Sequence, residues 1–145
     1  MSYRLKISKK NRAAVHKRAK GYCEYCACPS DHSPSPFCID HILPIILGGL
    51  SVLENLALAC FGCNRAKYML TQFADPISNV IVPIYNPRTD KWAEHFYWSD
   101  DYLQMVGLTA TGRATINALQ LNRASVINLR RALMANNLHP PEHIP

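Results

Sequence analysis

The chain has 145 residues, which suits one domain or a small metal-built domain with an extension, and it carries a formal net charge of +6. It contains no apolar run long enough to cross a membrane, and its first 18 residues lack the apolar core of a secretory signal. Six cysteines without such a signal indicate reduced thiols and metal binding in the cytoplasm rather than disulfides. The positive charge favours an anionic partner, nucleic acid first, although many small soluble proteins are mildly basic without one.

A basic helix is expected over residues 9–20, because Ser8 can cap its start and Gly21 can end it. Lysine and arginine cover most of its surface: Lys9, Lys10, Arg12, Lys17, Arg18 and Lys20. Such a helix can contact phosphate groups, with Arg12 and Lys17 as candidates, or it can be a solvated helix that leads into the next segment. The residues leave both interpretations open.

Short elements are expected next. Residues 27–36 contain three prolines and predict a loop, and the alternating residues 37–42 predict a strand. Ser51 and Glu54 have the spacing of a capping box, which predicts a single helical turn. A second strand is then expected over residues 56–60, and a helix over residues 64–71.

Two CxxC pairs enclose this region, and each pair can place two thiolates on one tetrahedral ion. We therefore predict a structural Zn²⁺ held by Cys23, Cys26, Cys60 and Cys63. A unit of this size buries little apolar surface, so that metal binding would supply folding free energy. The alternative is four buried free thiols. Cys28 and Cys38 are interpreted as packing residues.

The motifs GYCEYC, IDHILP, GG, ENLALAC and CNRAK appear in an order that resembles the HNH endonuclease family over roughly residues 12–68. The resemblance implies a ββα-metal (His-Me finger) fold, in which one metal ion lies between a short hairpin and a helix. It also implies a histidine that activates water to cut a DNA phosphodiester.

The resemblance also assigns roles to individual residues. Asp40 would bind the catalytic ion, His41 would be the general base, and Asn55 would hold the hairpin and orient the histidine. Asn64 stands where many members have a second histidine. With Asp40 it suits Mg²⁺ or Mn²⁺ better than Zn²⁺, unless it only caps a helix.

Two basic residues follow Asn64 on the predicted helix. Arg65 and Lys67 could contact the phosphate backbone, although a solvated side chain is the simpler interpretation of each.

The composition changes after Gln72, which suggests a nuclease domain over residues 1–72 and an extension over residues 73–145 packed on it. Strands are expected at 80–85, 92–98 and 105–108, and helices at 110–121 and 123–136, with Asn122 as the cap between the helices. The extension could simply cover the metal core. It could also dock DNA through four arginines: Arg113, Arg123, Arg130 and Arg131.

The predicted fold class is α+β, with a ββα-metal core stapled by a four-cysteine zinc site and a C-terminal strand and two-helix extension. The predicted function is metal-dependent cleavage of DNA by an HNH endonuclease. Two alternatives stay open. One is a zinc-dependent nucleic-acid-binding module without cleavage, and the other is a nuclease-like subunit that contacts a protein partner through residues 77–136.

Overall fold

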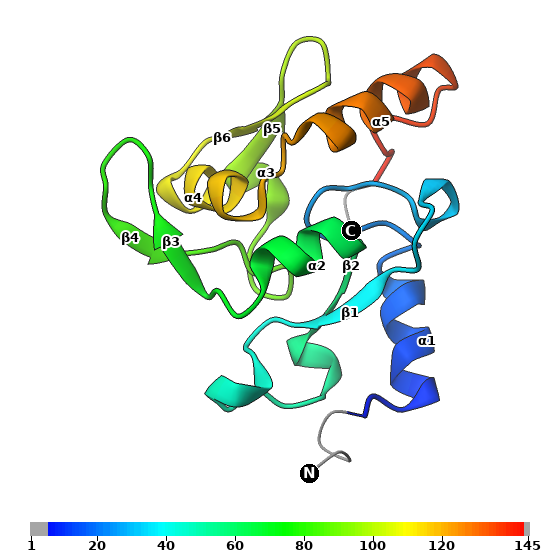
Figure 1. The fold of residues 1–145 in the computed structure, drawn as a ribbon, viewed down its shortest axis with the longest axis vertical. Coiled ribbons are helices and arrows are strands. Elements are labelled where there is room, and N and C mark those ends of the chain that lie inside the picture. The colour runs from blue at the N-terminus through cyan, green and yellow to red at the C-terminus, as the bar shows by residue number, and fades with distance from the viewer. Residues whose placement is uncertain (1–5, 144–145) are drawn as a thin grey trace.

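The computed structural model describes residues 6–143, which form three two-stranded antiparallel sheets with five α-helices among them (Figure 1). The chain is therefore a small protein of mixed helix and strand, as the predicted elements suggested. No helix in the described part is long and apolar enough to cross a membrane.

The predicted basic helix is present as α1 (Lys9–Arg18), which ends two residues before the expected limit. The Ser8 hydroxyl accepts a hydrogen bond from the Asn11 backbone N–H, as a capping residue does. Val15 is fully buried, and it packs with Ala19 against the second strand. Most other side chains of the helix are exposed or partly exposed, so the apolar attachment of α1 is narrow.

The first sheet pairs β1 (Cys38–His41) with β2 (Leu56–Ala59), both within two residues of their predicted limits. All four residues of β2 are buried because the strand is covered on both sides. Leu56 and Leu58 pack with α1, while Ala57 and Ala59 face the main core that contains the cysteines. The sheet thus lies between the basic helix and the rest of the protein.

Three single 3-10 turns occur in the loops around this sheet. The loop at 27–36 contains Ser30–His32, which the proline content did not suggest. The long loop after β1 contains Ile45–Leu47. The turn predicted from Ser51 and Glu54 is present at Leu53–Asn55, but no side-chain cap hydrogen bond starts it.

Helix α2 (Phe61–Lys67) follows β2 directly and begins three residues earlier than predicted. Its N-cap is Cys60, whose sulfur accepts a hydrogen bond from the Cys63 backbone N–H. Asn64 therefore lies inside the helix, and its interpretation as a cap was wrong. The helix packs against β1, so that a hairpin and a helix follow one another at this point of the fold.

The second half of the chain supplies two further hairpins and two longer helices. Strand β3 (Gln72–Ala74), which was not predicted, pairs with β4 (Ile81–Pro83), and β5 (Phe96–Trp98) pairs with β6 (Met105–Gly107). Helix α4 (Ala110–Leu119) packs against β3, β4, β6 and α2, and α5 (Ala124–Ala135) completes the extension.

Two predictions for this half were wrong in part. The aromatic stretch 92–98 begins with the helical turn α3 (Trp92–His95), and only its last three residues are a strand. Asn122 is not a cap. Its side chain accepts from the backbone N–H of Met105 at 2.8 Å and donates to the carbonyl of the same residue at 2.9 Å, so it ties the helix junction to β6.

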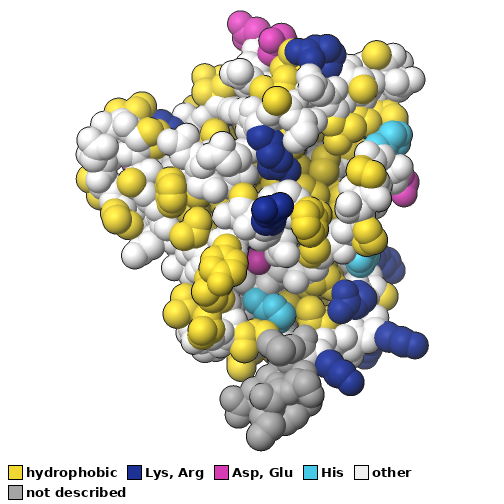
Figure 2. All heavy atoms as spheres, in the orientation of Figure 1, with side chains coloured by type: hydrophobic (Ala, Val, Ile, Leu, Met, Phe, Trp, Pro, Cys, Tyr) yellow, Lys and Arg dark blue, Asp and Glu magenta, His cyan; other side chains and the backbone are white. Residues whose placement is uncertain are grey.

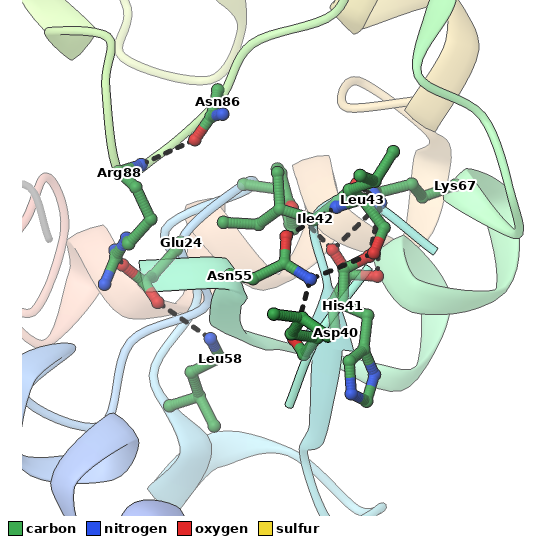
Figure 3. A network of polar contacts seen from close by, with 12 residues as sticks. Glu24, Asp40, His41, Ile42, Leu43, Asn55, Leu58, Lys67, Asn86 and Arg88 are labelled. Carbon is green, nitrogen blue, oxygen red and sulfur yellow. Dashed lines mark hydrogen bonds and ion pairs between the residues drawn. The ribbon is translucent and has the colours of Figure 1, made fainter. Parts of the chain in front are cut away.

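One hydrophobic core joins the two halves of the chain. It contains four cysteines of the CxxC pairs together with Ile84, Phe96, Leu119 and Val126 of the extension. A polar link adds to it, because the buried carboxylate of Glu24 accepts from the backbone N–H of Leu58 at 2.7 Å and pairs with Arg88 (Figure 3). Residues of the second half of the chain thus pack against the cysteine region, and the division into domains at residue 72 stays a prediction.

The arginines of the extension are mostly used inside the protein. Arg113 pairs with the buried carboxylate of Asp75, and Arg130 is buried with its guanidinium 5.1 Å from the centre of the Trp98 ring. Arg123 contacts the sulfur atoms of the cysteine cluster. Of the four arginines that could have docked DNA, Arg131 alone is exposed, so the structure favours a packing role.

Candidate metal and catalytic site

Four cysteines from two distant parts of the chain converge on one point. Their sulfur atoms all lie within 4.8 Å of one another, and all four side chains are buried: Cys23, Cys26, Cys60 and Cys63. The first pair lies in the turn after α1, and the second pair spans the end of β2 and the start of α2. The predicted grouping of these cysteines is thus present in the fold.

The geometry of the cluster suits a tetrahedral ion. Zinc–sulfur bonds of about 2.3 Å in a tetrahedron place neighbouring sulfur atoms about 3.8 Å apart, and the sulfur atoms of Cys26 and Cys60 are 3.7 Å apart. In each pair the backbone N–H of the second cysteine lies 3.4 Å from the sulfur of the first. Four sulfur atoms grouped around one point, two of them accepting from backbone N–H groups, fit a structural metal such as zinc.

A second site lies where the end of β1 meets α2. Asp40, His41 and Asn64 line one cavity of about 340 Å³, together with the apolar side chains of the loop after β1 and the residues that follow α2. Asp40 and His41 come from the end of β1, and Asn64 comes from the middle of α2. The fold therefore brings together Asp40, His41 and Asn64, three of the four residues predicted to carry the catalysis and its metal ion.

Asp40 is deeply buried and hydrogen-bonded. The Tyr25 hydroxyl donates to it at 2.7 Å, and the ammonium group of Lys67 lies 3.0 Å and 3.2 Å from its two oxygens. Burial raises the pKa of Asp40, while the Lys67 charge and the Tyr25 hydrogen bond oppose that effect. Its carboxylate thus belongs to a buried network and also lies at the wall of the cavity.

The same ammonium group binds the main chain. Lys67 Nζ lies 3.3 Å from the carbonyl oxygen of His41 and 3.1 Å from that of Ile42, so four oxygens surround it (Figure 3). The side chain is 1% exposed. The prediction that Lys67 contacts the phosphate backbone is therefore wrong for this structure. The ammonium group is buried and links α2 to the end of β1 through its contacts with Asp40 and the two carbonyls.

His41 is half-buried at the edge of the cavity. Its Nε2 atom lies 2.8 Å from the Ser51 hydroxyl, and its ring points away from the carbonyl groups that Lys67 and Asn55 bind (Figure 3). Burial lowers the pKa of His41, the Asp40 carboxylate acts in the opposite direction, and the Lys67 charge lowers it further. A neutral imidazole at pH 7 follows, since the ordinary histidine value is about 6.5.

Asn55 holds the loop that follows His41. Its side-chain oxygen accepts from the Leu43 backbone N–H at 2.8 Å, and its amide donates to the carbonyls of Leu43 and Leu50 at 3.0 Å and 2.9 Å. The backbone of Gly49 also approaches this loop closely, because a Cβ on Gly49 would lie 1.7 Å from the Leu43 carbonyl oxygen. Asn55 therefore fixes the course of the chain two residues after the histidine.

The remaining predicted nucleic-acid contacts are exposed. Arg65 lies on the outer side of α2, and Arg12 and Lys17 project from α1. Lysine and arginine side chains gather over α1 in Figure 2, at the lower right of the view. Arg18 differs from them, because its guanidinium donates to the carbonyls of Leu53 and Leu56 at 2.9 Å and 2.6 Å and anchors the helix.

The comparison with known protein families agrees with this arrangement. Residues 23–69 match the family model described as HNH endonuclease. This part of the chain is thus similar to an HNH domain, and it is called the HNH segment below. Searches of curated proteins and of solved structures found no match to the chain. The HNH segment spans the four cysteines and the three cavity residues, and it indicates a nuclease or nucleic-acid-binding function.

Sequence reasoning missed three residues at these sites. Tyr25 lies inside the first CxxC pair and binds Asp40, and Ser51 binds His41 rather than capping a turn. Arg123 reaches the cysteines from 60 residues further along the chain. The position of Tyr25 between two metal ligands was a usable signal. The other two contacts depend on how the chain folds back on itself, which no local pattern reveals.

Proposed function

We propose that this protein is a metal-dependent endonuclease that hydrolyses DNA phosphodiester bonds. One observation carries the proposal: Asp40, His41 and Asn64 line a single cavity within a segment that matches the HNH endonuclease model. A hairpin followed by a helix, with these residues between them, is also what a ββα-metal fold requires. The four-cysteine cluster would then be its structural zinc site.

Two of the cavity residues suit a catalytic ion. The Asp40 carboxylate and the Asn64 amide offer oxygen ligands, which Mg²⁺ and Mn²⁺ prefer and Zn²⁺ does not. Both belong to the wall of the same cavity. Bound there, the ion would polarise the scissile phosphate and stabilise the leaving oxygen.

His41 would remove the proton from the attacking water. A neutral imidazole is needed for this step, and the burial of the ring lowers its pKa and so favours that form. Because Nε2 contacts the Ser51 hydroxyl, the opposite nitrogen, Nδ1, is the atom that would face the water. Nε2 must then carry the hydrogen and donate it to Ser51, so that Nδ1 is free to accept the proton.

The neighbours of this pair would keep it in place. Lys67 donates to the backbone carbonyls of His41 and Ile42, and Asn55 fixes the loop that follows. Hydrogen bonds of this kind hold the backbone of a catalytic residue within the narrow range that proton transfer requires. We assign Lys67 and Asn55 to positioning, not to contact with the substrate.

Phosphate groups of the substrate would be bound by exposed basic residues. Arg65 lies one residue after Asn64, and Arg12 and Lys17 lie on α1, which packs on the opposite side of the first sheet. Positive side chains on both sides of a narrow sheet suit an elongated polyanion.

Plasmid cleavage tests the proposal. Zinc-loaded protein is incubated with supercoiled plasmid, with and without Mg²⁺ or Mn²⁺, and the nicked and linear forms are measured. We expect cleavage with the divalent ion and none with excess EDTA added at the start for a time too short to remove the buried zinc. Asn64→His is a further test, because an imidazole ligand should shift the preference from Mg²⁺ toward softer ions. An unchanged preference would remove Asn64 from the metal site.

A second candidate is a zinc-dependent nucleic-acid-binding module without cleavage. Its support is the pairing of Asp40 with Lys67, which leaves the carboxylate already occupied by a cation, and the Asn64 side chain in place of a second histidine. Retardation of DNA in a gel without cleavage under any divalent ion would favour this candidate over the first.

A further inference from the structure

Arg123 lies against the cysteine cluster, although it belongs to the extension and precedes α5. Its guanidinium Nη2 is 3.5 Å from the sulfur of Cys60 and 3.7 Å from that of Cys63, and Nη1 is 3.6 Å from the sulfur of Cys63. The planar group thus faces two of the four sulfur atoms with both of its terminal nitrogens. The contact is also tight, because a Cβ on Gly62 would lie 2.5 Å from Nη2.

The charges of the two groups are complementary. Four thiolates around one Zn²⁺ carry a net charge of about −2, and the cluster is buried. Such a charge is costly away from water unless a cation or hydrogen-bond donors face it. The backbone N–H groups of Cys26 and Cys63 supply two donors, and the guanidinium supplies further donors with a full positive charge.

No other arginine in the described part of the chain is placed in this way. Arg130 is buried nearby, but it donates to oxygen atoms and not to sulfur: the carbonyls of Leu103, Leu121 and Cys26 and the Asn122 side chain. Arg131 is exposed and bonds to Asn128. The sulfur contacts are therefore specific to Arg123.

We propose that Arg123 is a charge-compensating partner of the four-cysteine metal site, through which the C-terminal extension tunes how tightly the HNH segment retains its metal ion. The proposal concerns metal retention and is independent of whether the protein cleaves DNA. It also gives the extension a role beyond covering apolar surface. Residues that support metal ligands by hydrogen bonds typically contribute a factor of about 10 to 100 in metal affinity.

Arg123→Met tests the proposal, because methionine keeps much of the side-chain bulk and removes the charge and the donors. Transfer of zinc from the full chain to a colorimetric chelator is followed at pH 7, with Arg131→Met as the matched control on the same segment. We expect Arg123→Met to accelerate zinc loss by about ten-fold or more, and the control to leave it unchanged.

A spectroscopic measurement separates charge compensation from a structural role. Arg123 also donates to the carbonyls of Leu119 and Gln120 at the end of α4, so its loss could loosen the helix without acting on the metal. With Co²⁺ in place of zinc, the sulfur-to-metal charge-transfer band reports the electron density of the thiolates. Removing donors from sulfur should move this band to lower energy in Arg123→Met and not in Arg131→Met.

Two further variants keep the test decisive. Arg123→Lys retains a cation but not the planar pair of donor nitrogens, and we expect it to shift the band less than Arg123→Met. Gly62→Ala should push the guanidinium off the sulfur atoms without removing it, and it should shift the band in the same direction. An unshifted cobalt band in Arg123→Met would overturn the proposal, whatever the zinc release. If that variant does not fold, unshifted bands in both Arg123→Lys and Gly62→Ala would overturn it.

Discussion

The N-terminal part of the chain, which comprises α1 and the HNH segment, differs from the extension in how most of its basic residues are used. In the extension, Arg113, Arg123 and Arg130 are all turned to partners inside the protein. On α1, which leads into the HNH segment, most basic side chains project into solvent. The number of arginines in the extension is thus not a measure of its nucleic-acid surface, because Arg113 pairs with the buried Asp75 and Arg123 faces cysteine sulfur atoms.

The two regions also differ in what holds them together. The HNH segment has two short strands and one short helix, and its two ends meet at the cysteine cluster. The extension is held by apolar packing around Phe96, Leu119 and Val126. A metal ion bound at the cysteines would replace, in the first region, the hydrophobic surface that the second region buries.

Metal removal should have the largest effect, and it tests whether the two regions are separable. Binding of structural zinc contributes about 10 kcal/mol or more in small zinc domains, which is comparable to the stability of a whole domain. Because the cysteines share one core with the extension, we expect Cys60→Ser to abolish the cooperative thermal transition of both regions. Circular dichroism and the fluorescence of Trp92 and Trp98, which belong to the extension, measure the two.

Cys38→Ser is the control for this prediction, since Cys38 is half-buried and outside the cluster. It should keep the transition. A tryptophan transition that survives in Cys60→Ser at the parental temperature would show that the extension folds by itself.

The next largest effect concerns the lysine that does not behave like the other basic residues of its segment. Lys67→Met leaves Asp40 buried without its cation, which typically costs about 3–5 kcal/mol. Arg65→Ala, on the exposed side of the same helix, should change stability by no more than about 0.5 kcal/mol. Denaturant unfolding measures both. Equal, small effects would mean that Lys67 is solvated in solution, and its role as a phosphate contact would return.

The ion pair between Asp75 and Arg113 in the extension predicts a contribution to stability that depends on pH. The Arg113 guanidinium is the main cause that holds the pKa of Asp75 well below its ordinary range. Hydrogen bonds from Ser78 and Ile77 lower this pKa further. A lowered pKa stabilises the fold above the unfolded value of about 3.9, and this contribution is lost as the pH falls through the folded value. Asp75→Asn should therefore lower the melting temperature at pH 7, and the difference from the parent should shrink below about pH 4.

The exposed Asp31 gives a control of the same chemistry. Asp31→Asn should melt like the parent at both pH values. If the melting temperatures of Asp75→Asn and the parent differ equally at pH 7 and pH 3, the pair with Arg113 is not the source of the stability.

The smallest effect concerns the surface of α1. Each lost phosphate contact should reduce the slope of log affinity against log salt by about 0.9. We expect this for Arg12→Ala and for Lys17→Ala, with unchanged stability, and no change for Arg131→Ala. Binding to a short DNA duplex at several salt concentrations measures the slope. If Arg131→Ala alone reduced the slope, the nucleic-acid surface would lie on the extension.

The sequence predicted best what depends on local spacing. Two CxxC pairs identify the cysteine cluster because the spacing within each pair fixes two neighbouring ligands. Sequence reasoning failed for Lys67, which was expected to be exposed. A signal was present, because Lys67 lies four residues after the predicted metal ligand Cys63 and hence on the same buried face of α2. The aromatic stretch 92–98 was misread because strand propensity was weighed without the contact between the rings of Trp92 and Phe96, which lie four residues apart across the turn α3. The role of Arg123 depends on the return of a distant segment, which spacing cannot show.

The central claim is that the cavity lined by Asp40, His41 and Asn64 performs the cleavage, and a single comparison tests it. Parent and His41→Ala, with equal zinc content, are assayed side by side on supercoiled plasmid in the same divalent ion. We expect nicking by the parent and a loss of at least about 100-fold in the variant, which is the lower contribution of a general base. Equal nicking by both proteins would contradict the assignment of His41 and of the cavity.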